Sequence, residues 1–163
     1  MNKSREVRYF QDQLEGNHCF GCGPKNGDGL QIKSYWGNDQ EAFCEFKPKL
    51  HHCAAPTGFL NGGVMATLID CHCICTAIAH AYRKNGHDIG QGPTRWYATA
   101  KLDVSYLRPT PIDATIIVKA RIVGESEKTT DISCTLEAND RECAKANVVA
   151  AAVPESWMST YKA

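Results

Sequence analysis

The stretch that decides the fold is residues 61–84, NGGVMATLIDCHCICTAIAHAYRK. It contains no proline and, after Gly63, no glycine, and apolar residues cover most of its circumference when it is drawn as a helix. Asn61 is a preferred N-cap residue, and Asn85-Gly86 is a preferred stop signal. The stretch therefore predicts one central helix over residues 61–84 that is buried in the core.

Outside this helix, apolar and polar residues alternate with a period of two, which is typical of half-buried strands. Two short runs, residues 31–36 and 41–47, come before the helix and are joined by the turn-forming triplet Gly37-Asn38-Asp39. Four longer runs come after it. Their members that share a face are Ala98, Ala100, Leu102, Val104 and Tyr106; Ile116, Val118, Ala120 and Ile122; Ile132, Cys134, Leu136 and Ala138; and Ala144, Ala146, Val148, Ala150 and Ala152. One buried helix with about six strands predicts an α+β domain in which a curved antiparallel sheet wraps around the helix.

The length of 163 residues suits a single domain spanning residues 1–163. Within residues 1–16, Val7, Phe10 and Leu14 recur at helical spacing and Gly16 follows them. We therefore expect a short amphipathic N-terminal helix.

The bulk composition argues against several classes of protein. Eighteen basic and eighteen acidic residues give a net charge of zero, so a basic surface for nucleic acid is not expected. The opening residues, MNKSREVRYFQDQLEG, lack the apolar core of a secretory signal. No uninterrupted apolar run approaches the roughly 20 residues that cross a bilayer. We expect a soluble, cytoplasmic protein that binds neither nucleic acid nor membrane.

Nine cysteines, an odd number without an export signal, favour reduced thiols over a disulfide framework. Cys19 and Cys22 nevertheless have the spacing of metal ligands. The conceivable partners for a zinc ion there are His18, His51, His52 and Cys53. Because a second CxxC is missing, we expect a loop of reduced thiols, with no metal and no cofactor.

The segment at residues 60–70, LNGGVMATLID, resembles the hotdog-fold thioesterases of the phenylacetate-pathway type and their mammalian acyl-CoA thioesterase relatives. Their signature is His-Gly-Gly at the start of the hotdog helix, with an acidic residue nine positions after the His. Here Asn61 stands at the His position, followed by Gly62 and Gly63, with Asp70 at the expected spacing. The opening loop CFGCGPKNGDGL and the strand DVSYLRP agree with the family, and the similarity covers roughly residues 17–154.

The resemblance implies hydrolysis of an acyl- or aryl-CoA thioester. Asp70 would act as general base or nucleophile, the amides of Gly62 and Gly63 as oxyanion donors, and Asn61 as helix cap and carbonyl donor. The hydroxyl of Thr99 aligns with a strand hydroxyl that assists in some relatives. Among the neighbours of Asp70, small residues would leave room for the acyl group. The predicted substrate-binding residues are Gly62, Ala66, Cys73 and Arg108, the last of which could meet a CoA phosphate or could be a solvated strand end.

Helix geometry adds a prediction about assembly. Gly63 and Asp70 are about 10 Å apart along one helix, too far for both to touch one carbonyl. If both act, they come from different copies, so we expect a homodimer, alone or paired into a homotetramer. This agrees with the family, whose active sites lie at the dimer interface.

Two departures from the family pattern leave alternatives open. Asn61 replaces the family's His, and Ala55 stands where several relatives carry an Asn that orients the nucleophile or water. His51, His52 or Asn61 would then have to substitute for that Asn. The alternatives are a non-catalytic acyl-CoA-binding hotdog protein and a hydratase or dehydratase of the acyl thioester. The latter reaction typically needs a His beside the carboxylate, and the helix start has none.

Overall fold

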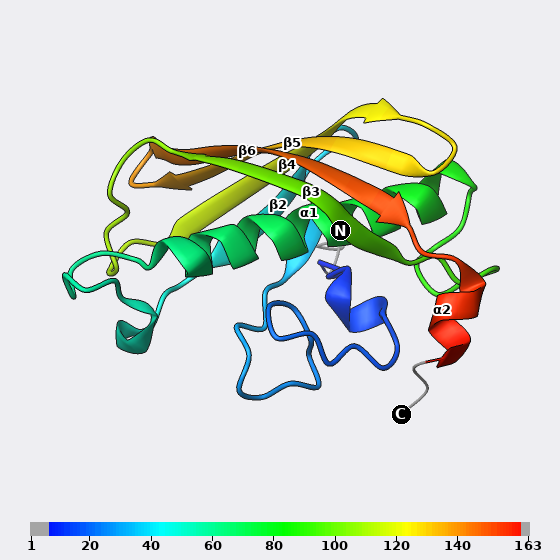
Figure 1. Ribbon diagram of the computed structural model, residues 1–163, viewed down its shortest axis with the longest axis horizontal. Coiled ribbons are helices and arrows are strands. Elements are labelled where there is room, and N and C mark those ends of the chain that lie inside the picture. Colours follow the sequence, from blue (N-terminus) through cyan, green and yellow to red (C-terminus); the bar gives the residue numbers. More distant parts are fainter. Residues whose placement is uncertain (1–6, 161–163) are drawn as a thin grey trace, which may run out of the picture.

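The computed structural model describes residues 7–160 as a curved sheet that covers one side of a long helix (Figure 1). All six strands are antiparallel to their neighbours, and their order across the sheet is β1-β2-β4-β5-β6-β3. This is the α+β hotdog architecture expected from the sequence. The elements are η1 (Gln11–Gln13), β1 (Ser34–Trp36), β2 (Ala42–Phe46), η2 (Leu50–His52), α1 (Gly62–Lys84), β3 (Tyr97–Tyr106), β4 (Ile116–Glu125), β5 (Thr129–Ala138), β6 (Arg141–Ala152) and α2 (Glu155–Thr160).

The central helix α1 confirms the expected span and cap. The Asn61 side chain accepts hydrogen bonds from the backbone amides of Gly63 and Val64. Leu68 and Ile69 are fully buried, in one core cluster with inward residues of β4, β5 and β6. By length and composition, α1 could cross a membrane, but 61% of its most apolar window is buried inside the fold. Such burial is usual for the core helix of a globular domain.

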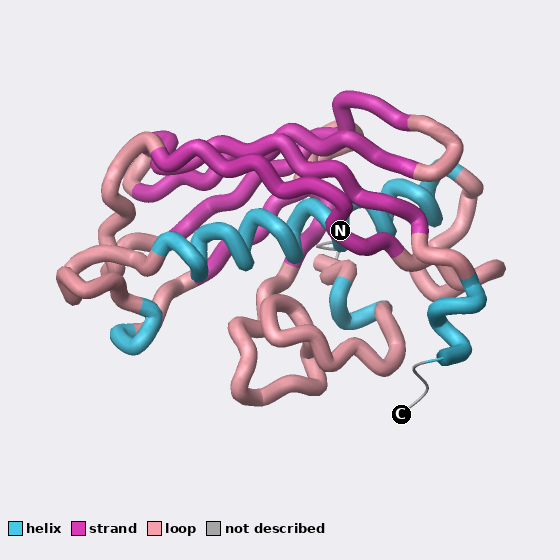
Figure 2. Tube along the Cα trace, in the orientation of Figure 1, coloured by secondary structure: helices cyan, strands magenta, loops and turns pink. Residues whose placement is uncertain are grey.

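The expected N-terminal helix is wrong for the residues that the structure describes. Only the 3-10 turn η1 forms between residues 7 and 16, while residues 1–6 lie outside the described part of the chain. Phe10 donates its backbone amide to Ser34 of β1, and Phe10 and Leu14 are buried in the core. The apolar spacing therefore reflects packing rather than a continuous helix. Together with the following loop, this segment lies on the side of α1 that faces away from the sheet (Figure 2).

A buried polar network ties this segment to α1. The Gln11 side chain donates to the Ser34 hydroxyl over 2.8 Å and accepts from the Ser34 amide over 2.7 Å. The fully buried His72 lies 2.9 Å from the same hydroxyl and 3.2 Å from the carbonyl oxygen of Ala42. Burial lowers the pKa of His72 to about 4, so the ring is neutral at pH 7. Its partners make it a structural residue.

The hairpins predicted from the sequence are present, with shorter first strands. β1 and β2 occupy residues 34–36 and 42–46, within the predicted runs 31–36 and 41–47. At the β5–β6 turn, Asn139 and Asp140 have φ values of 50° and 58°, which these two residue types tolerate best after glycine.

Strand β3 forms one edge of the sheet, and its alternation differs from the prediction. Leu102, Val104 and Tyr106 lie opposite buried residues of β6, as expected. A bulge between Thr99 and Lys101 then shifts the register by one residue. Because of this bulge Thr99, instead of Ala98 and Ala100, shares the inward face with Leu102.

Candidate active site

The carboxylate of Asp70 and the hydroxyl of Thr99 meet between α1 and β3. Thr99 donates its hydroxyl hydrogen to the Asp70 carboxylate with an oxygen–oxygen distance of 2.5 Å. Such a short contact is typical of a hydrogen bond to an ionised acceptor. Asp70 is half-buried in the protomer, and Thr99 is exposed on the edge strand. Two of the residues predicted to be catalytic are therefore brought together.

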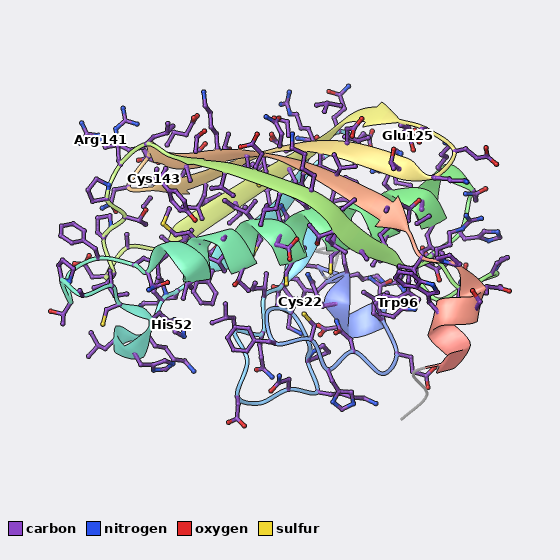
Figure 3. The ribbon with its side chains drawn as sticks, viewed as in Figure 1. Cys22, His52, Trp96, Glu125, Arg141 and Cys143 are labelled. Carbon is purple, nitrogen blue, oxygen red and sulfur yellow. The ribbon has the colours of Figure 1, made fainter. Side chains whose placement is uncertain are left out.

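This pair lies in the wall of a pocket of about 220 Å³. Ile74 and Ile78 contribute apolar surface from α1, and Trp96 and Tyr97 contribute it from the start of β3. The N-terminal segment closes the remaining side with Leu14 and the Cys19–Cys22 loop. In Figure 3, Cys22 of this loop lies next to α1, and Trp96 lies toward the α2 end. An apolar pocket with one carboxylate is suited to an acyl or aryl group whose reactive carbon lies near Asp70.

Burial raises the pKa of the Asp70 carboxyl, and the hydrogen bond from Thr99 opposes this shift. A carboxylate that is partly removed from water is a stronger base and nucleophile than a fully solvated one. Thr99 donates its hydrogen bond to one carboxylate oxygen of Asp70, which leaves the other carboxylate oxygen available to accept a proton or to attack a carbonyl carbon.

The start of α1 offers one free amide rather than the two expected. Gly63 donates its amide to the Asn61 side chain over 2.8 Å, so the expectation of two unpaired amides is corrected. Between residues 7 and 160, the amide of Gly62 has no hydrogen-bond acceptor. The Tyr106 hydroxyl donates to the Gly62 carbonyl oxygen over 2.9 Å and fixes this turn on β3. A free amide at the positive end of a helix is a suitable oxyanion donor.

Gly62, which carries the free amide, lines a second groove of about 300 Å³ that is distinct from the Asp70 pocket. Gly62, Tyr106 and Arg108 line it. One terminal nitrogen of Arg108 donates to the carbonyl oxygen of Glu142 over 2.6 Å, and the residue is exposed. The guanidinium therefore keeps other N–H groups available at the surface beside the helix start.

None of the four predicted substrate-binding residues lines the Asp70 pocket: Gly62 and Arg108 line the second groove, and Ala66 and Cys73 line neither hollow. Cys73 is fully buried, and its thiol faces Cys134 of β5, so the prediction for Cys73 is wrong. Ala66 is half-buried outside the pocket wall. The residues that take their place are Cys71 and Ile74. The pocket lies on the helix face turned toward the N-terminal segment, whereas Cys73 faces the sheet.

The structure also regroups the candidate metal ligands. His52 accepts a hydrogen bond from the Lys49 amide, and His51 stacks edge-on against it, away from the Cys19–Cys22 loop. The thiols that face this loop are instead Cys71 and Cys75 of α1. Their spacing of four residues, which places both on one face of a helix, is the signal that could have identified them.

Comparison with known proteins agrees with the fold. Residues 57–145 match the thioesterase superfamily, and the chain belongs to that family. A thioesterase superfamily protein from Shewanella loihica is 30% identical, with 76% of this chain and 91% of that chain covered at a TM-score of 0.59. Thioesterase superfamily member 2 from Mus musculus has 20% identity, 74% and 81% coverage and a TM-score of 0.54, which supports the fold.

A sequence relative is the acyl-coenzyme A thioesterase THEM4 of Rattus norvegicus. It is 22% identical over 133 residues, which are 81% of this chain and 51% of the relative. This chain thus spans about half the length of that protein.

Proposed function

We propose that this protein hydrolyses an acyl-CoA or aryl-CoA thioester to the free acid and CoA. The observation that supports the proposal most strongly is the Asp70 carboxylate, which accepts a hydrogen bond from Thr99 in the wall of an apolar pocket. Membership of the thioesterase superfamily supports the reaction class, and the acyl-coenzyme A thioesterase relative supports CoA as the carrier.

The chemistry needs one base or nucleophile and one oxyanion donor. Asp70 accepts a proton from a water molecule whose oxygen attacks the thioester carbon. Alternatively, its own oxygen attacks that carbon to give an anhydride, which water then cleaves. In both routes the carbonyl oxygen becomes negative while the C–S bond is still intact. The bond then breaks, and the sulfur leaves as the CoA thiol once it has taken up a proton.

The donor for this oxyanion is the Gly62 amide of a second copy. Within one copy, Gly62 lies at the first turn of α1 and Asp70 about two turns later, about 12 Å along the axis. Strand β3 offers a route to a dimer because it is the edge of the sheet and most of its residues are exposed. Pairing of two β3 edges would bring the helix start of one copy toward the Asp70 pocket of the other.

In such a dimer, the two hollows bind different parts of one substrate. The acyl or aryl group occupies the pocket beside Asp70, and the thioester lies at the boundary between the copies. The groove around Gly62 then receives the start of the CoA chain. Arg108, at the edge of that groove, is placed to contact a CoA phosphate.

The test is thiol release from a panel of acyl- and aryl-CoA esters. We expect turnover by the wild-type protein and a loss of about 10²- to 10⁴-fold in Asp70→Asn, the range for removal of a catalytic base. Asp140→Asn is the matched control, because Asp140 lies in the β5–β6 turn at φ 58°, where Asn fits equally well. Unchanged turnover in Asp70→Asn would contradict the assignment of Asp70.

The same assay tests a non-catalytic acyl-CoA-binding role. Ala55 and Asn61 favour this second candidate, because both replace side chains that relatives use in catalysis. Tight binding of acyl-CoA without thiol release would support it against hydrolysis. A hydratase is disfavoured, since no histidine lines the Asp70 pocket in the described part of the chain. Of the two histidines on α1, His72 is fully buried, and His80 is half-buried and forms a hydrogen bond with Glu125.

A further inference from the structure

Four cysteine thiols from two segments that are distant in the sequence come together where the N-terminal loop packs against α1. Cys19 and Cys22 come from the loop after the N-terminal turn, and Cys71 and Cys75 lie one turn apart on the helix. The Cys19 and Cys71 sulfurs are 3.7 Å apart, and the Cys22 and Cys75 sulfurs are 3.8 Å apart. The sulfurs of Cys19, Cys22 and Cys71 all lie within 4.8 Å of one another.

The two short separations between paired sulfurs are those of ligands that share one tetrahedral metal ion. A zinc ion bound by four thiolates at about 2.3 Å has sulfur–sulfur edges of about 3.8 Å. A disulfide would need about 2.05 Å between sulfurs, so the two observed pairs are not bonded to each other. The Cys19–Cys71 and Cys22–Cys75 separations match two edges of this tetrahedron. The Cys75 sulfur is not within 4.8 Å of all three other sulfurs, so its side chain has to turn toward the ion to complete the set.

The loop is shaped to hold its two thiols against the helix. A side chain at Gly21 would place its Cβ 2.2 Å from the Cys71 sulfur and would push that sulfur out of its present position, which glycine avoids. The Gly23 amide donates to the Cys19 carbonyl oxygen over 2.8 Å, which closes a tight turn around the pair. Gly23 is equally constrained, because its Cβ would lie 2.4 Å from the Cys19 nitrogen.

A buried asparagine supports the cluster from behind. The Asn17 side-chain amide donates to the Cys22 sulfur at 3.7 Å, and its oxygen accepts from the Cys19 amide at 3.0 Å. Such outer hydrogen bonds orient thiolate ligands in metal sites.

We propose that Cys19, Cys22, Cys71 and Cys75 bind one Zn²⁺ ion in a structural Cys₄ site. Four protein ligands leave no open position on zinc, so the ion has no direct part in the chemistry. It clamps the N-terminal loop to α1 beside Asp70 and so fixes one wall of the acyl pocket. This departs from the expectation of a metal-free loop of reduced thiols.

The test is the metal content of the full-length protein, purified without chelators and measured by elemental analysis. We expect about one zinc per chain and loss of it in Cys22→Ser. Cys53→Ser is the matched control, because Cys53 is half-buried on a different loop and is not part of the cluster. Replacement of zinc by Co²⁺ should give the intense absorption of a tetrahedral thiolate site.

The unmodified protein keeps the proposal falsifiable even if Cys22→Ser fails to fold. Metal-free protein with native circular dichroism, stoichiometric iron in place of zinc, or two disulfides by intact mass would each overturn it. These measurements do not depend on turnover. Zinc content should also be unchanged in Asp70→Asn, so failure of the hydrolase proposal and failure of the zinc proposal can be distinguished.

Discussion

Replacing Gly62 by proline would remove the proposed oxyanion donor while leaving the helix intact. Gly62 is the first residue of α1, and proline is favoured at the first helical position because the missing N–H has no helical partner there. The residue before a proline must be extended, and Asn61 already has ψ 135°. The added Cβ would meet the Tyr106 ring at 3.6 Å, an ordinary contact.

The expected effect follows from the role of a single donor. Loss of one oxyanion hydrogen bond lowers kcat by about 10²- to 10³-fold in enzymes that use one. The assay is thiol release at saturating acyl-CoA, with the free energy of unfolding measured in urea alongside. Gly62→Ala is the control, because it adds the same Cβ and keeps the amide hydrogen. If Gly62→Pro were as active as Gly62→Ala, the Gly62 amide would not be the donor.

Three further changes test the site and the packing around it. Thr99→Val removes a hydrogen bond to the Asp70 carboxylate and should lower kcat/KM by about 10- to 100-fold. Thr99→Ser keeps the hydroxyl and should retain the wild-type kcat/KM. Equal rates in the two variants would contradict the positioning role of Thr99. Asn61→Ala removes the cap and should cost about 0.5–2 kcal/mol of unfolding free energy, whereas Asn61→Asp should retain most of it. Leu136→Ala opens a cavity at a fully buried core position and should lower the free energy of unfolding measured in urea by about 2–5 kcal/mol. A smaller loss would mean that neighbouring side chains around β5 move in to fill the cavity.

Periodicity was sufficient to predict the core of this fold. The span of α1 and the strands β4, β5 and β6 follow from apolar spacing, because a strand with one buried and one solvent-exposed face alternates apolar and polar residues with a period of two. The N-terminal helix was wrong because a short segment gains little from its own hydrogen bonds. Phe10 instead donates its amide to Ser34 of β1.

The site was only partly predictable for related reasons. The family spacing identified Asp70, but the bulge that turns Thr99 inward has no clear signature in the strand sequence. The capping of Gly63 by Asn61 could have been foreseen, because an N-cap side chain bonds the very amides that would otherwise be free. The four-cysteine cluster joins segments 52 and 53 residues apart, a pairing that local spacing does not contain.

Activity in mixed dimers tests the central claim most directly, namely that Asp70 of one copy and the Gly62 amide of another act on the same thioester. Asp70→Asn and Gly62→Pro chains, each inactive alone, are unfolded together, refolded and assayed for thiol release. The account predicts recovery of about a quarter of wild-type activity, since half of randomly formed dimers are mixed and each mixed dimer has one intact site. Activity that stays at the level of the separate variants would show that the two groups do not share a site between copies.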